Sequence, residues 1–292
     1  MNTILEFLYK KTFTITEILL PRVAGKWAAT LFTTPIRYKR PEHEVPYMES
    51  AQIQKVKLKP LFSRPKQAPF YQIYTWGEGP VVLLVHGWSG RGSQMGSMVQ
   101  PLVKVGYQVI AFDAFAHGES PGETSNLVEF KQIVEHIYQN HGAFHAIIGH
   151  SWGGIAAGLA ISEGVQSEKL VTIGSPTTMD FITESFCLNL GAGKKTAKYI
   201  LEHVTNLTQK EADYFSLARI WARLDIDGLI IHDKDDKEAD YSQALLLDKS
   251  WKNGRLVTTK QLGHRRILKD EKVLNAILDF IESTPDVQRV AS

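Results

Sequence analysis

Five short and almost uninterrupted apolar runs constrain the fold of this 292-residue chain more than any other feature of its sequence. Each run is separated from the next by a stretch long enough to hold a helix. Continuous apolar runs of this length are typical of parallel strands that helices cover on both faces. The runs lie at 81–85, 109–112, 146–148, 170–173 and 229–231.

The segments around these runs complete an α/β pattern. Residues 51–58 and 71–76 alternate apolar and polar side chains, as half-exposed antiparallel strands do, and a last strand is predicted at 255–261. Helical stretches are predicted at 94–105, 126–140, 152–163 and 270–283. We therefore predict an α/β fold with a mostly parallel central sheet flanked by helices.

The interval between the runs at 170–173 and 229–231 is too long for one crossover, and its 179–224 portion has a helical pattern. We interpret this stretch as a helical cap inserted after the sixth strand. The predicted division of the chain is an N-terminal helical segment at 1–45, a core at 46–176 and 227–292, and a cap at 177–226.

The N-terminal segment carries large apolar residues at every fourth position, which indicates an amphipathic helix. Pro21 should kink this helix or open a second one at its first turn. We expect the apolar stripe to pack across the body of the protein. A helix lying on a membrane surface is the alternative, and we do not expect membrane contact. The stripe consists of Ile15, Leu19, Val23, Trp27 and Leu31.

Composition excludes several classes of function. The chain has 33 Lys and Arg against 31 Asp and Glu, a balance that argues against binding to nucleic acid. Its one cysteine, Cys187, rules out an internal disulfide and a Cys-rich zinc site, and it is expected to be a small apolar residue of the cap. This cysteine usage fits a reducing compartment, so we expect a cytoplasmic protein. We find no metal-binding motif and predict no cofactor, and the oligomeric state stays open.

Ser151 lies in the sequence Gly-His-Ser-Trp-Gly, directly after the apolar run at 146–148 and before a helix-compatible stretch. On a tight strand-to-helix turn of this kind the flanking glycines permit crowding that a side chain would block, and the serine hydroxyl is exposed. The serine is therefore a candidate nucleophile. In the alternative interpretation it only caps a helix after a glycine turn.

A serine nucleophile needs a base and an acid from elsewhere in the chain. His264 follows the strand predicted at 255–261 and lies on a loop before the last helix. The acid candidates follow the apolar run at 229–231. The order serine, acid, histidine places each group at the carboxyl end of a predicted strand, where α/β active sites assemble. The acid candidates are Asp233, Asp235, Asp236 and Glu238, with Asp180 after the sixth strand as a less favoured alternative, and Asp240 is expected to be a solvated neighbour.

Over about residues 50–285, the chain resembles the α/β-hydrolase-fold serine hydrolases of the carboxylesterase and lipase type. His86-Gly87-Trp88 resembles the His-Gly-x oxyanion loop of the family. Residues 113–120 resemble its Asp-x-x-Gly-x-Gly-x-Ser turn, with Ala116 where glycine is usual. Residues 233–236 resemble its Gly-x-x-Asp acid loop, with Asp233 at the glycine and Asp236 at the acid.

The resemblance implies a Ser151, Asp236 and His264 triad and an oxyanion hole made by the backbone N–H groups of Trp88 and Trp152. It implies a small-molecule ester or thioester as the substrate. A nucleophilic serine also excludes the dehalogenases and epoxide hydrolases of this fold, which attack through aspartate. The alternatives are a non-catalytic binding protein, and an acyl transferase or C–C bond hydrolase that uses the same triad.

The predicted cap holds enough large apolar residues to line an acyl pocket, and Trp88, Phe181 and Phe186 are the substrate-binding candidates. Because the two tryptophans at the oxyanion hole add bulk near the carbonyl, we expect small to medium apolar acyl groups rather than long chains. The wider set of cap candidates is Phe181, Ile182, Phe186, Leu188, Leu190, Tyr199, Ile200, Leu201 and Tyr214.

Overall fold

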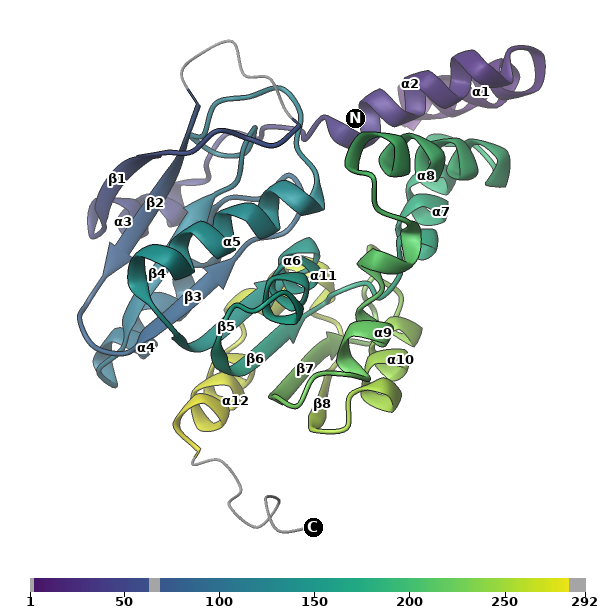
Figure 1. Ribbon diagram of the computed structural model, residues 1–292. Helices are drawn as coiled ribbons and strands as arrows, with labels where there is room; N and C mark the ends of the chain where they lie inside the picture. Colours follow the sequence, from purple (N-terminus) through teal and green to yellow (C-terminus); the bar gives the residue numbers. More distant parts are fainter. Residues whose placement is uncertain (1–2, 63–68, 284–292) are drawn as a thin grey trace.

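The computed structural model describes residues 3–62 and 69–283, and within them one eight-stranded sheet runs through the molecule (Figure 1). The strand order is β1-β2-β4-β3-β5-β6-β7-β8. β1 and β2 are antiparallel to their neighbours, and all other pairs are parallel, which confirms the predicted fold class. The strands are β1 (Gln52–Lys57), β2 (Phe70–Trp76), β3 (Val81–Val85), β4 (Gln108–Asp113), β5 (Phe144–His150), β6 (Ser167–Ile173), β7 (Asp227–Asp233) and β8 (Gly254–Thr259).

Helices cover both faces of this sheet, as the uninterrupted apolar runs required. Along β3, Val82 and Leu84 pack on one face and Leu83 and Val85 on the other, because successive side chains of a strand alternate. The first face is covered by η2 (Gly92–Met98), α4 (Val99–Lys104) and α12 (Glu271–Glu282). The second is covered by α5 (Leu127–His141), α6 (Trp152–Ser162) and α10 (Ser242–Ser250).

Two predicted elements differ in detail from the structure. The helix expected at 94–105 begins as the 3₁₀ helix η2 and becomes α-helical only at Val99. The strand expected at 255–261 ends at Thr259, and Gln261 adopts a positive φ of 64°. The remaining short elements before β1 and after β8 are η1 (Glu42–Glu44), α3 (Val45–Glu49), α11 (Gly263–Arg266) and η4 (Ile267–Lys269).

Four helical elements lie between β6 and β7, in the stretch interpreted as a cap. They are α7 (Met179–Leu190), α8 (Lys194–Thr208), η3 (Ala212–Phe215) and α9 (Leu217–Trp221). α7 and α8 pack together on one side of the sheet, whereas α9 packs against α6 and α10 of the core (Figure 1). Trp221 of α9 stacks on Trp251 with ring centroids 4.3 Å apart, which fixes this end of the insertion to the core.

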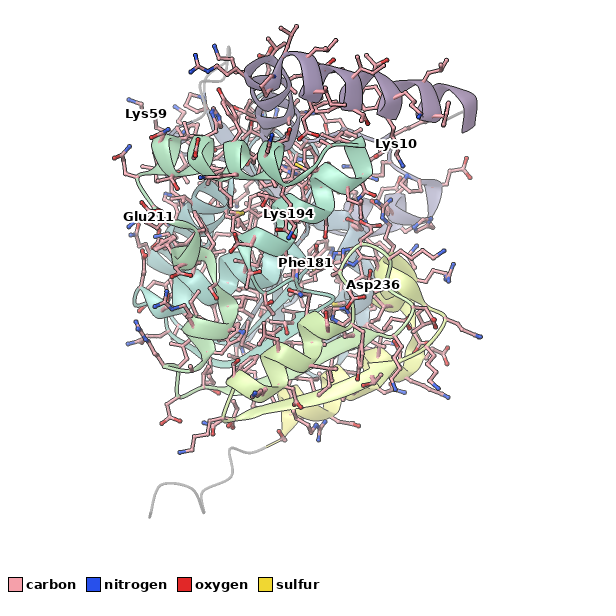
Figure 2. All side chains as sticks on the ribbon, turned by 90° about the vertical axis from the view of Figure 1, so that its right-hand side faces the viewer. Lys10, Lys59, Phe181, Lys194, Glu211 and Asp236 are labelled. Atoms are coloured by element: carbon pink, nitrogen blue, oxygen red, sulfur yellow. The ribbon has the colours of Figure 1, made fainter. Side chains whose placement is uncertain are left out.

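The N-terminal segment folds into a hairpin of two helices, α1 (Thr3–Leu19) and α2 (Pro21–Thr33). Pro21 occupies the first position of α2, which is one of the two outcomes that the sequence predicted. The hairpin lies on α8 and α7 as the outermost layer of the molecule (Figures 1 and 2). Between the two helices, Phe13 stacks on Trp27 with ring centroids 4.6 Å apart. None of the described helices is long and apolar enough to cross a membrane.

The prediction that the N-terminal apolar stripe faces the body is wrong for its first three members. Ile15, Leu19 and Val23 are 54%, 70% and 51% exposed, and Trp27 and Leu31 are half-buried. The repeat of four residues crosses the turn at Leu20, where the chain reverses direction, so the stripe does not lie on one helix face. α2 instead buries small residues and Phe32. This lets it approach α8 so closely that a Cβ at Gly25 would lie 2.4 Å from the Tyr199 ring.

Polar contacts hold the hairpin to the loop between α7 and α8. The Glu17 carboxylate accepts hydrogen bonds from Gly193 N at 2.9 Å and from Thr196 Oγ1 at 2.7 Å, at the first turn of α8. Thr14 Oγ1 donates to Gly191 O at 2.6 Å. Glu17 therefore caps the N-terminus of α8 from another element and places a negative charge at the positive end of its dipole.

Replacing Glu17 should loosen this contact. Loss of an N-terminal cap costs about 1 kcal/mol, so we expect Glu17→Ala to lower Tm by about 2 °C in a scanning calorimetry experiment. Glu78→Ala, a change at an exposed residue of the turn between β2 and β3, is the matched control and should leave Tm unchanged. Equal Tm values for the two variants would show that the Glu17 contact adds nothing.

Candidate active site

The turn between β5 and α6 holds Ser151 in a strained conformation. Its φ of 53° and ψ of −120° lie outside the regions that L-residues favour. The flanking glycines make this turn sterically allowed: a Cβ at Gly149 would lie 2.5 Å from Gly154, and one at Gly153 would lie 2.0 Å from Val85 O. Ser151 N donates to Ile173 O at 2.9 Å, which ties the turn to β6. The motif therefore forms the strand-turn-helix context that the sequence indicated.

His264 and Asp236 form a buried pair beside this turn. His264 Nδ1 donates to Asp236 Oδ2 at 2.7 Å, which leaves Nε2 as a hydrogen-bond acceptor. Asp236 Oδ1 accepts backbone N–H groups of Glu238 at 2.8 Å and Ala239 at 3.0 Å. Burial alone would raise the pKa of Asp236, but His264 and these two N–H groups outweigh it and hold the pKa below its ordinary value. Asp236 is therefore ionised at neutral pH.

The other acid candidates have structural contacts instead. Asp233 accepts from Thr259 Oγ1 at 2.7 Å and from Leu262 N at 3.0 Å, so its side chain fastens the loop that carries His264. Asp235 Oδ2 accepts from Gln261 N at 2.8 Å. Glu238 Oε2 is 3.9 Å from His264 Nε2 and pairs with Arg265 through Oε1 at 3.3 Å. Asp240 accepts from Ser242 N at 2.9 Å, and Asp180 is exposed on the first turn of α7.

His150 supports His264 from the residue next to Ser151, and the sequence reasoning missed it. Its Nε2 donates to His264 O at 2.9 Å, and the two rings lie 4.6 Å apart. Burial, with a smaller contribution from His264, lowers the pKa of His150 to about 3, so the ring is neutral. The available signal was the place of His150 in the Gly-x-Ser-x-Gly motif, because the first x residue is held beside the serine by the same turn.

The His86-Gly87-Trp88 loop lies directly against the serine. A Cβ at Gly87 would lie 2.9 Å from Ser151 Cβ. His86 bridges this loop to β4, donating from Nδ1 to Gly87 O at 2.7 Å and accepting Ala114 N on Nε2 at 3.0 Å. Burial lowers the pKa of His86 to about 4, so this bridge is made by a neutral ring. The loop is therefore held rigidly beside the nucleophile candidate.

The turn after β4 supports the same loop. The buried Asp113 carboxylate accepts Gly92 N at 2.7 Å, Glu119 N at 2.8 Å and Tyr74 OH at 2.7 Å. Ser89 N donates to His117 Nε2 at 3.0 Å. Ala116, which stands where the related motif has glycine, adopts a φ of 64°. The alanine thus takes the left-handed conformation that glycine adopts more readily.

A cavity of about 800 Å³ opens between the core and α7, and Ser151, His264 and Trp88 line it. Phe181 and Phe186 of α7 line it as well, and Figure 2 shows Phe181 to the left of Asp236 and slightly higher. The structure therefore brings the serine, the histidine and the three substrate-binding candidates together around one cavity. Asp236 does not line this cavity and is hydrogen-bonded to His264.

Trp88, Trp152 and Phe186 line one wall of this cavity, and Phe32, which does not line it, packs between Trp152 and Phe186. Trp88 and Trp152 lie 4.4 Å apart by ring centroids, Trp152 and Phe32 5.7 Å, and Phe32 and Phe186 5.2 Å. Phe32 belongs to α2, so the N-terminal hairpin supports the wall, which the sequence did not indicate.

Most of the wider set of cap residues have other contacts. Of that set, Ile182 joins Phe181 and Phe186 on the lining, whereas Leu188 is 76% exposed and Ile200 is fully buried. Tyr199 faces Gly25, and Tyr214 OH donates to Glu163 Oε1 at 2.6 Å. Leu190 and Leu201 pack against the core. Periodicity alone could not separate pocket-lining from packing residues in this insertion.

Comparisons with known proteins identify the fold and the family. Residues 80–187 match the family model of the alpha/beta hydrolase fold. The human serine hydrolase-like protein 2 is 30% identical over 163 residues, which cover 51% of this chain and 49% of that protein. The human serine hydrolase-like protein is 30% identical over 162 residues, which cover 51% of this chain and 75% of that protein. The match to the first of these relatives thus spans about half of its length.

The solved structures show the same fold. An esterase from Exiguobacterium antarcticum superposes with a TM-score of 0.58 at 17% identity, over 77% of this chain and all of the esterase. The sheet order, the strained serine turn and these matches lead to one assignment. The chain belongs to the α/β-hydrolase-fold family of serine hydrolases.

Proposed function

We propose that this hydrolase cleaves a carboxylic ester or thioester of a small to medium apolar acyl group, with Ser151, His264 and Asp236 as its catalytic triad. The observation that carries the proposal is the buried 2.7 Å hydrogen bond between His264 and Asp236 on the cavity that Ser151 lines. This bond orients an imidazole whose free Nε2 can accept a proton.

In the proposed mechanism, His264 Nε2 accepts the Ser151 Oγ proton as the oxygen attacks the substrate carbonyl. The ionised Asp236 stabilises the imidazolium and holds its tautomer. The imidazolium then protonates the leaving alcohol or thiol, and an acyl-enzyme remains on Ser151. His264 next takes a proton from water as the water oxygen attacks the acyl-enzyme carbonyl. The imidazolium then returns this proton to Ser151 Oγ as the bond between Oγ and the acyl carbon breaks, which releases the acid and restores the free enzyme.

The oxyanion of each tetrahedral intermediate would be bound by the backbone N–H groups of Trp88 and Trp152. Trp152 is the first residue of α6, so its N–H has no acceptor within the helix and lies at the positive end of the dipole. Trp88 follows Gly87, which packs against Ser151. Each such donor contributes about 3 kcal/mol to transition-state stabilisation.

A non-catalytic binding protein explains these features less well. The positive φ of Ser151 and the buried Asp236 carboxylate both cost free energy of folding, and a binding scaffold has no need of either. Both features serve a reaction that needs an exposed hydroxyl and an oriented base. The complete set of triad side chains around one cavity therefore favours catalysis.

Ser151→Ala should abolish both ester hydrolysis and covalent labelling by a fluorophosphonate, because the nucleophile is lost. His264→Ala should do the same, since the hydroxyl loses its base. Labelling is read by intact-protein mass spectrometry, with Tm recorded to show that each variant is folded. Fluorophosphonate adducts on folded Ser151→Ala would contradict the assignment of the nucleophile.

Asp236→Asn should lower kcat by a factor on the order of 10⁴, because an amide favours the wrong imidazole tautomer. Asp235→Asn is the matched control: its amide oxygen can still accept the Gln261 N–H, so we expect kcat close to that of the unmodified enzyme. Both are measured by steady-state kinetics on the same ester. A larger loss in Asp235→Asn than in Asp236→Asn would place the triad acid one residue earlier.

A series of p-nitrophenyl esters tests the substrate class. The aromatic row from Trp88 to Phe186 should crowd long acyl chains, so kcat/KM should peak at short or medium length. Phe186→Ala should shift that peak to longer chains by removing part of the wall. A kcat/KM that still rises beyond about ten acyl carbons, with each methylene adding to apolar burial, would indicate a lipase-like channel.

A further inference from the structure

The outer surface of the N-terminal hairpin is strongly apolar. Five large side chains surround the turn between α1 and α2, and we call them the hairpin tip. They are Ile15 at 54% exposed, Ile18 at 73%, Leu19 at 70%, Leu20 at 57% and Val23 at 51%. Phe7 and Leu8 extend the same exposed character along α1, at 59% and 54%. A contiguous apolar surface on an outer layer marks an interaction site.

This surface is held in place by the packing beneath it. On the inner side of the hairpin Phe13 is fully buried against Trp27, and Glu17 binds the first turn of α8. The hairpin is the outermost layer above α8 and α7 (Figures 1 and 2). The tip residues are therefore presented outward by a well-packed pair of helices.

Basic side chains accompany the tip. Lys11, Arg22 and Lys26 are exposed, and no carboxylate of the described residues forms an ion pair with any of them. Between residues 7 and 26 the one acidic side chain is Glu17, and its carboxylate is occupied by α8. The exposed charge around the tip is therefore positive.

The exposure of Ile15, Leu19 and Val23 removes the reason for expecting no membrane contact, and we propose that the hairpin tip inserts into the surface of an anionic phospholipid membrane. Apolar side chains flanked by Lys and Arg are the pattern of helices that bind in the interfacial layer, where the basic groups meet anionic headgroups. A second copy of the chain fits less well. In a two-fold dimer the patch would face itself and bring like charges together. The inference does not depend on the reaction at Ser151.

The test measures co-sedimentation of the full-length protein with phosphatidylcholine vesicles, with and without phosphatidylglycerol. Ile18→Asp/Leu19→Asp places two carboxylates on the tip. Leu245→Asp/Leu246→Asp is the matched control, since it changes an adjacent pair of exposed leucines on α10. Lys11→Gln/Arg22→Gln/Lys26→Gln removes the positive charge and keeps the tip. Circular dichroism melting shows whether each variant is folded.

We expect binding to the anionic vesicles, a loss of about tenfold or more in the tip variant, and unchanged binding in the control pair. The charge variant should bind more weakly, and added salt should weaken the binding of the unmodified protein. Failure to bind anionic vesicles would overturn the proposal, as would equal binding by the tip variant. A dimer in light scattering that the tip variant converts to monomer, with no vesicle binding, would assign the patch to self-association instead.

Discussion

The position of the reactive serine depends on how closely two backbone segments pass one another. The first turn of α6 approaches the end of β3 so closely that any side chain at Gly153 would overlap Val85 O. Gly149 likewise leaves no room for a side chain, and within the tight turn that these glycines permit Ser151 takes a positive φ. The strain is retained because the buried sheet on one side and the helix on the other leave the turn no alternative.

Three buried histidines then organise the loops around this turn. His86 and His117 tie the loop at 86–90 to the segment that follows β4, and His150 ties the serine turn to the backbone of His264. Burial lowers the pKa of all three, so each ring is neutral. His86 and His117 both donate and accept, whereas His150 donates through Nε2 and its Nδ1 has no hydrogen-bond partner among the described residues. Neutral imidazoles suit this use because each ring supplies one donor and one acceptor in fixed directions. His264 differs from these three because its Nδ1 donates a hydrogen bond to the Asp236 carboxylate.

The sequence predicted the sheet and the serine turn well because both rest on local signals. Apolar runs such as 81–85 indicate strands that are buried on both faces of the sheet. The glycines beside Ser151 indicate a turn with no room for side chains at their positions. It failed where the outcome depends on tertiary contacts. The apolar stripe from Ile15 to Leu31 looked continuous because the spacing of four residues continues through Leu20, where the chain reverses direction between α1 and α2. The contacts of His150 and Phe32 involve residues more than one hundred positions away, which no local pattern encodes.

Phe32 packs between Trp152 and Phe186, so α2 supports the wall of a cavity that it does not itself line. The sheet, the serine turn and the His264–Asp236 pair all come from other parts of the chain. The aromatic wall of the cavity, in contrast, packs against α2, which precedes the core. The candidate reacting groups and the support of the cavity wall thus come from separate segments of one polypeptide. A change in the hairpin that moves Phe32 is thus expected to reshape the cavity wall and to leave Ser151, His264 and Asp236 where they are.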